Sequence, residues 1–218
     1  MQPQILNILD IMKDLVSVQS DTGTKMEENM AERIAAYFRE DSYLSVHPDH
    51  WGLADTNDFL GRRVVWALKE GTSRKTLILT GHYDAVEIDC YGELKPLALK
   101  PEALREEMLR QKLGDELMQQ ELASGDWLPG RAAADMKGGL AIGLYELLTL
   151  PENAEIGVLF VAVCDEENVS AGMRGAVNVL LELKRRFALD YLATLVLEPQ
   201  LPLAGKEFMV YNLSLIHI

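Results

Sequence analysis

The feature that most constrains the fold is a pair of strands that are apolar along their whole length. Ile156–Cys164 is a continuous apolar run, and Tyr191–Leu197 is a second one. Helical patterns cover Gly138–Leu150 and Ala171–Phe187. Strands without a polar side, alternating with helices, are typical of a parallel sheet that is covered on both faces. The sequence therefore predicts an α/β fold whose central sheet is mainly parallel or mixed, with helices on both faces.

The first part of the chain is expected to extend this architecture. Apolar residues recur at helical spacing in the first eighteen residues and again in Met26–Arg39, which predicts two amphipathic helices. Two β-rich runs follow, Arg63–Leu68 and Thr76–Thr80. The short turn Gly71–Arg74 between these runs favours a hairpin-like connection.

Two segments carry a different pattern. Polar and turn-forming residues fill Asp49–Gly61, so a loop is expected there. In Glu87–Trp127 a narrow apolar stripe lies among many charges, and Pro101 stands where a helix could begin. We expect residues 87–127 to form a helical insert that largely faces solvent, with ordinary packing rather than partner binding as the role of its stripe.

Charge and composition exclude several classes of protein. The 218 residues contain 21 Lys and Arg against 34 Asp and Glu, a net charge of −13, which argues against nucleic-acid binding. Cys90 and Cys164 are too few for a disulfide framework and fit a reducing compartment. The apolar run Ile156–Cys164 is roughly half of the ~20 residues that span a bilayer, and Met1–Gln4 does not begin a signal peptide. We expect a cytoplasmic protein that binds neither nucleic acid nor membrane.

Several familiar catalytic motifs are absent from the sequence. Gly130–Lys137 superficially suggests a phosphate loop, but no glycine precedes the lysine and no Ser or Thr follows it. There is also no GxGxxG, GxSxG, CxxC or HExxH. Dinucleotide cofactors, serine nucleophiles and the common zinc-protease helix therefore lack support.

One histidine and several acidic residues follow the predicted strands or precede the predicted helices. Because the carboxyl ends of strands in an open α/β sheet meet in one crevice, we expect these side chains to lie together. The steps from Asp135 to Glu167 and from Glu167 to Glu198, 32 and 31 residues, are about the length of a βαβ unit. The full set is His82, Asp84, Asp135, Asp165, Glu166, Glu167 and Glu198.

Such a group of carboxylates is costly unless a cation is present, because like charges repel one another. Nitrogen and oxygen ligands of this kind suit zinc, cobalt or manganese. Taken alone, His82 could be an ordinary satisfied histidine, and Glu198 could simply close a strand. Their joint occurrence at successive strand ends is what favours a metal site.

The adjacent pair Glu166–Glu167 adds a second indication. Neighbouring side chains at a strand end point in different directions, so one carboxylate can bind metal while the other faces water. Metal-assisted hydrolysis requires this division between a Lewis acid and a carboxylate base.

Three segments closely resemble the co-catalytic zinc metallopeptidases, and they occur in that family's order. They are Thr80–Val86 (TGHYDAV), Gly130–Gly139 (GRAAADMKGG) and Asp165–Glu167 (DEE). This family includes aminoacylase-1, acetylornithine deacetylase, succinyl-diaminopimelate desuccinylase and carboxypeptidase G2. Ser124–Arg131 and Asp165–Arg174 are similar to its RocB-type, arginine-utilisation branch. The resemblance covers essentially the whole chain apart from its last few residues.

The resemblance implies a site with two divalent ions, zinc first, with cobalt or manganese as alternatives. His82 and Glu198 would bind one ion, Glu167 would bind the other, and Asp135 would bridge both.

The resemblance also implies roles for the neighbours of these ligands. Asp84 would form a hydrogen bond with His82, and Glu166 would be the general base that acts on water. The peptide bond Asp135–Met136 would be cis. Ala132 departs from the family, which often has glycine at that position.

The function that the resemblance implies is hydrolysis of a peptide or N-acyl amino-acid amide bond, with a small substrate of that class. The alternative is a non-catalytic, metallopeptidase-like binding or regulatory protein. Retention of both Glu166 and Glu167 favours the enzyme, because a mere binder needs no base.

Residues 1–211 are expected to form a catalytic metallohydrolase domain that is incomplete at its C-terminus. The family's last ligand, a distant histidine, has no counterpart, and neither does the second domain through which a homodimer could form. His217 lies too close to Glu198 to replace that histidine. A strand is expected at Glu207–Tyr211, and Asn212–Ile218 resembles a non-native tail of sequencing-adaptor origin. We therefore expect a fragment that is inactive, or nearly so, by itself.

Overall fold

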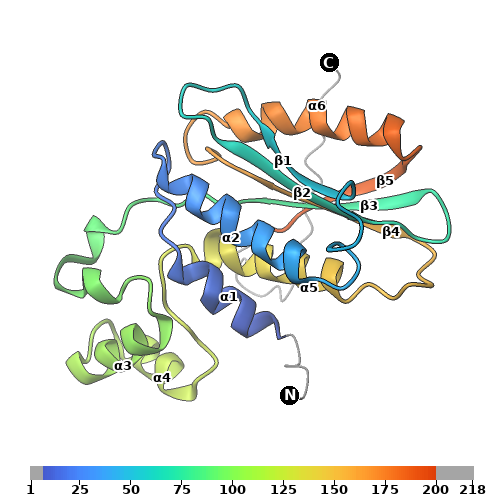
Figure 1. Cartoon of the computed structure of the whole chain (residues 1–218). Helices are drawn as coiled ribbons and strands as arrows, with labels where there is room; N and C mark the ends of the chain where they lie inside the picture. Colours follow the sequence, from blue (N-terminus) through green and yellow to red (C-terminus); the bar gives the residue numbers. More distant parts are fainter. Residues whose placement is uncertain (1–6, 200–218) are drawn as a thin grey trace.

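A single mixed sheet forms the centre of the molecule (Figure 1). The structure is a computed structural model, and it describes residues 7–199. The strands lie in the order β1-β2-β4-β3-β5. β3 lies between β4 and β5 and runs parallel to both. β2 lies between β1 and β4 and runs antiparallel to both. The strands are β1 (Trp51–Asp55), β2 (Arg63–Lys69), β3 (Lys75–His82), β4 (Gly157–Val163) and β5 (Asp190–Val196).

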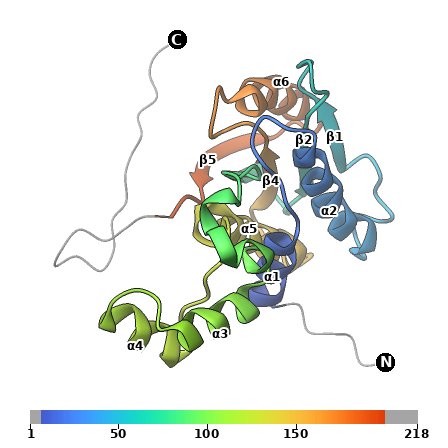
Figure 2. The same cartoon turned by 90° about the vertical axis from the view of Figure 1, so that its left-hand side faces the viewer.

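Helices cover both faces of this sheet, as predicted (Figures 1 and 2). α2 (Met26–Glu40) and α5 (Gly139–Leu148) pack on one face, and α1 (Ile8–Ser17) packs against α5. α6 (Ala171–Arg186) covers the opposite face. The α/β class and the predicted helices are confirmed within the described residues.

The central strand β4 shows why the sequence is apolar without alternation. All seven of its residues are buried. Val158, Phe160 and Ala162 belong to the core under α2 and α5. Leu159 and Val161, which point the other way, belong to the core under α6. A strand covered on both sides has no polar face, which accounts for the continuous run in the sequence.

Two expectations about the strands were wrong. The polar segment 49–61 contains β1, a short edge strand that pairs with β2 from Trp51 to Asp55. The connection 70–74 does not close a hairpin, because β4 lies between β2 and β3. The turn instead bonds to the loop before β4, since the amide of Thr72 donates to the carbonyl of Ala154 at 2.8 Å. Such long-range pairing leaves no local signal in the sequence.

The segment 87–127 projects beside the layered core (Figures 1 and 2). It contains a 3-10 segment η1 (Asp89–Leu97) and two helices, α3 (Pro101–Gln111) and α4 (Glu116–Ser124). Lys112, in the left-handed conformation with φ 54°, separates the two helices. Of the apolar side chains, Leu104 is buried and Leu117 is 62% exposed.

No helix between residues 7 and 199 has the length and apolar character needed to cross a membrane. The predicted strand at 207–211, the proposed tail 212–218 and His217 lie outside the described residues.

Candidate metal centre

The parallel strands β3, β4 and β5 end at the same edge of the sheet and deliver polar side chains there. His82 is the last residue of β3, and Glu198 follows β5. Glu166 and Glu167 lie in the turn after β4. Asp135 comes from η2 (Ala133–Gly138), a distorted helical turn before α5 that packs against β3.

Two close approaches at glycine bring these segments together. A Cβ atom on Gly81 of β3 would lie 2.2 Å from Cε of Met136, the residue after Asp135. A Cβ atom on Gly139 would lie 2.0 Å from the carbonyl oxygen of Leu197, the residue before Glu198. A side chain at Gly81 would force the flexible end of Met136 to shift, whereas one at Gly139 would displace the main chain of Leu197, next to Glu198.

The resulting cluster contains one imidazole and several carboxylates. Nε2 of His82 lies 2.9 Å from Oδ1 of Asp135 and 3.6 Å from Oε1 of Glu198. One ligand atom each from His82, Asp135 and Glu167 lies within 4.8 Å of the others. Oε2 of Glu166 is 4.0 Å from the same Nε2. The histidine is buried, whereas the side chain of Asp135 is 57% exposed, so the imidazole forms the floor of the cluster and the carboxylates face outward.

The predicted hydrogen bond between Asp84 and His82 is made by the main chain of Asp84 rather than by its carboxylate. Nδ1 of His82 lies 3.0 Å from the main-chain oxygen of Asp84 and 3.4 Å from its carboxylate. The carboxylate instead accepts hydrogen bonds from the amides of Glu166, at 3.0 Å, and Glu167, at 3.2 Å. Asp84 thus orients the imidazole through its main chain, and its buried carboxylate fixes the turn of the acidic pair.

The electrostatics of the cluster show an excess of negative charge. Burial lowers the pKa of His82, but Asp84, Asp135 and Glu198 outweigh it and raise that pKa to about 9. Burial raises the pKa of Glu167, and the Asp135 carboxylate raises it further. Burial likewise raises the pKa of Glu198, with the Asp135 carboxylate adding to the shift.

The donor set fits divalent cations. Within residues 7–199, no lysine or arginine forms an ion pair with the outward-facing carboxylates. An imidazole nitrogen and carboxylate oxygens that converge without a compensating cation are suitable ligands for zinc and similar metals. These carboxylates are those of Asp135, Glu166, Glu167 and Glu198.

All four predicted ligands and Glu166 lie at this edge of the sheet. The peptide bond Asp135–Met136 is cis, as the family resemblance implied. Asp165 does not join the cluster, because its buried carboxylate pairs with Arg62 instead.

The connection between α1 and α2, together with the first turn of α2, was not predicted to have a role, yet it contacts three of the site's loops. The carbonyl of Val18 accepts a hydrogen bond from Nζ of buried Lys137, at 2.7 Å. The hydroxyl of Thr22 donates to Asp84 at 3.0 Å, and Glu27 accepts the amide of Asp165 at 2.9 Å. The sequence contains one sign of this arrangement. Glu27 lies three residues before Met30, so this acidic residue lies on the apolar side of α2.

Comparison with protein families and curated proteins gives consistent matches. Residues 111–213 match the family model described as Peptidase family M20/M25/M40. The protein YqjN of Bacillus subtilis (strain 168) is 37% identical over 195 residues, which are 88% of this chain and 35% of YqjN. RocB of the same organism is 35% identical over 187 residues, which are 83% of this chain and 33% of RocB. The chain spans about a third of the length of these curated relatives.

Solved structures share the fold. An M20 family metallo-carboxypeptidase from Sulfolobus solfataricus, Sso-CP2, superposes with a TM-score of 0.56 at 16% identity, over 87% of this chain and 37% of that one. Human carnosine dipeptidase 1 superposes with a TM-score of 0.53 at 16% identity, over the same shares of the two chains. At this identity the likeness is one of fold.

Proposed function

Because this chain belongs with the M20/M25/M40 peptidases in sequence and in fold, we propose that it is the metal-carrying part of a hydrolase. The bond cleaved is a peptide or N-acyl amino-acid amide bond in a small substrate. The observation that carries the proposal is the convergence of His82, Asp135 and Glu167, whose ligand atoms lie within 4.8 Å of one another.

In this proposal four residues hold two divalent ions, zinc first, with cobalt or manganese as alternatives. The residues that would hold these ions are His82, Asp135, Glu167 and Glu198. Ions at such a site polarise the scissile carbonyl and acidify water. The orientation of His82 supports the assignment, since Nδ1 faces the carbonyl of Asp84 and leaves Nε2 directed toward Asp135.

Glu166 is the residue that moves the proton. Its carboxylate takes the proton of the attacking water and passes it to the leaving nitrogen, as a general base and then a general acid. Its placement supports this role, because the side chain is half exposed and lies 4.0 Å from His82, at the rim of the cluster. The hydrogen bond from the amide of Glu166 to Asp84 fixes the main chain from which this side chain projects.

The further features of the whole protein belong to the same proposal. We place this hydrolase in the cytoplasm and in arginine utilisation, on the similarity of Ser124–Arg131 and Asp165–Arg174 to the RocB-type branch. Residues 1–211 act as its catalytic domain, with 87–127 as a helical insert. A homodimer, formed through a second domain of the kind that the family resemblance implies, belongs to the same proposal.

The experiment is a hydrolysis screen of the full-length protein that contains this chain. Dipeptides and N-acyl amino acids are offered with added zinc, cobalt or manganese, and Glu166→Gln serves as the matched control. We expect turnover that chelation abolishes and that the variant lacks. A protein that binds the ions in the same assay and cleaves none of the substrates would instead be a non-catalytic binding protein.

A further inference from the structure

A buried ion cluster lies behind the acidic pair. The side chain of Arg62 is 4% exposed, and those of Glu27 and Asp165 are fully buried. The three residues come from different elements, since Glu27 is on α2, Arg62 precedes β2 and Asp165 follows β4.

Arg62 is the centre of this cluster. Its Nη1 donates to Glu27 at 2.8 Å and to Asp165 at 2.7 Å, and its Nε donates to Asp58 at 2.6 Å. A planar guanidinium can serve several carboxylates at once, whereas an ammonium group lacks this fixed fork of donors.

The cluster holds Asp165 in an unusual backbone conformation. Asp165 has φ 63°, in the left-handed region, which among residues with a side chain is adopted mainly by Asn and Asp. Glu27 accepts its amide at 2.9 Å, its carbonyl accepts the amide of Ser170 at 2.7 Å, and its carboxylate accepts the amide of Ala171 at 3.0 Å. These contacts close the turn that contains Glu166 and Glu167.

This turn directs both amides of the acidic pair at one carboxylate. The amides of Glu166 and Glu167 lie 3.0 and 3.2 Å from Asp84, whose main-chain oxygen lies 3.0 Å from Nδ1 of His82. A continuous chain of contacts therefore runs from Arg62 to the imidazole of the candidate centre.

We propose that Arg62 and Glu27 are positioning residues, which hold Asp165 so that Glu166 and Glu167 are set on Asp84 and aimed at the metal centre. The orientation of Glu166 and Glu167 toward metal ions rests on the proposed function. The stabilisation of their turn by Arg62 and Glu27 does not. Neither residue touches the cluster of ligands, and neither lies in a segment that carries the family resemblance.

The test measures amide hydrogen exchange by NMR in the metal-free 218-residue chain. The variants are Arg62→Met, Arg62→Lys and Glu27→Gln. The matched control is Arg63→Met, since Arg63 is the next residue and forms ion pairs with Glu28 and Glu32 at the surface of α2. Amides of the buried strand β4, such as Phe160 and Val161, report on global stability.

We expect the amides of Glu166 and Glu167 to exchange at least about tenfold faster in Arg62→Met and Glu27→Gln, which corresponds to the loss of about one hydrogen bond. The amides of β4 should change less, Arg62→Lys should be intermediate, and Arg63→Met should match the unaltered chain. Equal acceleration at all amides, or a variant that does not fold, would show a merely structural role and overturn the proposal. Unchanged exchange in the turn would overturn it as well.

A second measurement separates this proposal from the proposed function. Titration with Zn²⁺ alone should give an affinity about 10–100-fold weaker in Arg62→Met and Glu27→Gln than in the unaltered chain, as is typical when the support of a ligand is lost. If the unaltered chain binds no zinc, the metal assignment fails, while the exchange result still decides the positioning role. If all variants bind zinc equally well, the positioning of ligands is refuted and the metal centre stands.

Discussion

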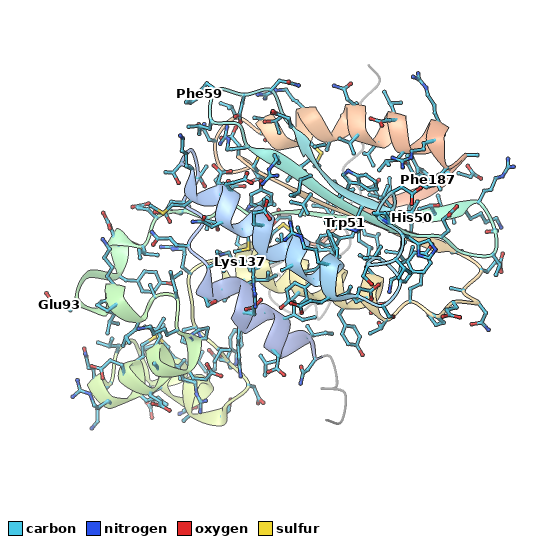
Figure 3. All side chains as sticks on the ribbon, viewed as in Figure 1. His50, Trp51, Phe59, Glu93, Lys137 and Phe187 are labelled. Atoms are coloured by element: carbon cyan, nitrogen blue, oxygen red, sulfur yellow. The ribbon has the colours of Figure 1, made fainter. Side chains whose placement is uncertain are left out.

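Histidine and carboxylate side chains lie together at both ends of the sheet, but the two ends differ in whether lysine or arginine pairs with the carboxylates. At the end opposite the candidate centre, His50 lies 3.0 Å from Asp49 through Nδ1 and 3.0 Å from Glu70 through Nε2. His50 precedes β1 and Glu70 follows β2, whose last residue pairs with the start of β4. Figure 3 shows His50 beside Phe187 and far from Lys137, and the two aromatic rings are 4.8 Å apart.

Two of the carboxylates at this opposite end have a lysine or arginine partner, while Glu70 pairs, among residues 7–199, with His50 alone. Lys69 pairs with Asp41 at 2.9 Å, and Arg186 lies 3.4 Å from Asp49. At the candidate centre, His82 is the one basic group within the described residues that pairs with the outward-facing carboxylates. Histidine near acidic residues is therefore a weak sign of a metal site. Carboxylates that converge without compensating cations are a stronger one.

The largest expected effect is a difference in turnover between substitutions made at the two ends of the sheet. In the full-length protein, Glu166→Gln should lower turnover by at least the ~10²–10⁴-fold that is typical of acid–base catalysis, with metal content retained. Glu70→Gln, at the other end, should leave turnover unchanged. Steady-state kinetics and metal analysis of both variants check this. Near-normal turnover in Glu166→Gln would remove Glu166 from its role.

The second effect concerns the pH dependence of stability in the metal-free chain. The folded-state pKa of His82 is about 9, above its usual value near 6.5, so the folded state binds this proton more tightly. The resulting stabilisation, about 3 kcal/mol, is fully present below pH ~6.5 and is lost as the pH rises through 9. Urea unfolding of the chain and of His82→Gln, with chelator present, should show a stability difference that shrinks over this range. A difference independent of pH would contradict the assignment.

The third effect compares the two histidines in metal binding. Titration calorimetry with Zn²⁺ should show His82→Ala losing at least the ~10–100-fold in affinity that even supporting residues provide. His50→Ala should bind zinc as the unaltered chain does, because His50 lies at the other end of the sheet, away from His82, Asp135 and Glu167. Equal losses in the two variants would remove the distinction between the ends.

The smallest effect concerns two alanines in the left-handed conformation. Ala132 leads into the turn of Asp135 and has φ 58°, and exposed Ala188 precedes β5 and has φ 53°. Glycine adopts this conformation without steric cost, so Ala188→Gly should raise the free energy of unfolding by about 0.5–1 kcal/mol. Ala132→Gly should gain less, because it also removes a buried methyl group. Denaturant unfolding measures both, and a loss of stability in Ala188→Gly would contradict the argument.

The strands that carry the site could be predicted because they are buried on both faces. β4 is continuously apolar, and the residues at or just after the ends of β3, β4 and β5 are the imidazole and acidic groups that stand out in the sequence. The edge strand β1 could not be found in this way, because its half-buried residues lack both an apolar run and a regular alternation.

The order of the strands and the buried ion cluster could not be predicted for a related reason. Placing β4 between β2 and β3 depends on pairing across the chain, for example Trp66 with Val161. The contact of Arg62 with Asp165 joins residues 103 positions apart, and no local pattern marks the pair. Periodicity reports what each element buries, but not which distant element covers it.

The connection between α1 and α2 has a consequence for the order of events during folding. Thr22 contacts Asp84 across 62 residues, and Val18 contacts Lys137 across 119. Glu27, in the first turn of α2, contacts Asp165 across 138 residues. Contacts of such separation form late, because the entropy of closing long loops must be overcome first. We therefore expect the ligands to reach their final arrangement only after the two N-terminal helices have docked. In a chain that is still folding, the ligands would be separate and would bind metal ions only weakly. Selective binding of a metal ion would therefore begin only when folding is nearly complete.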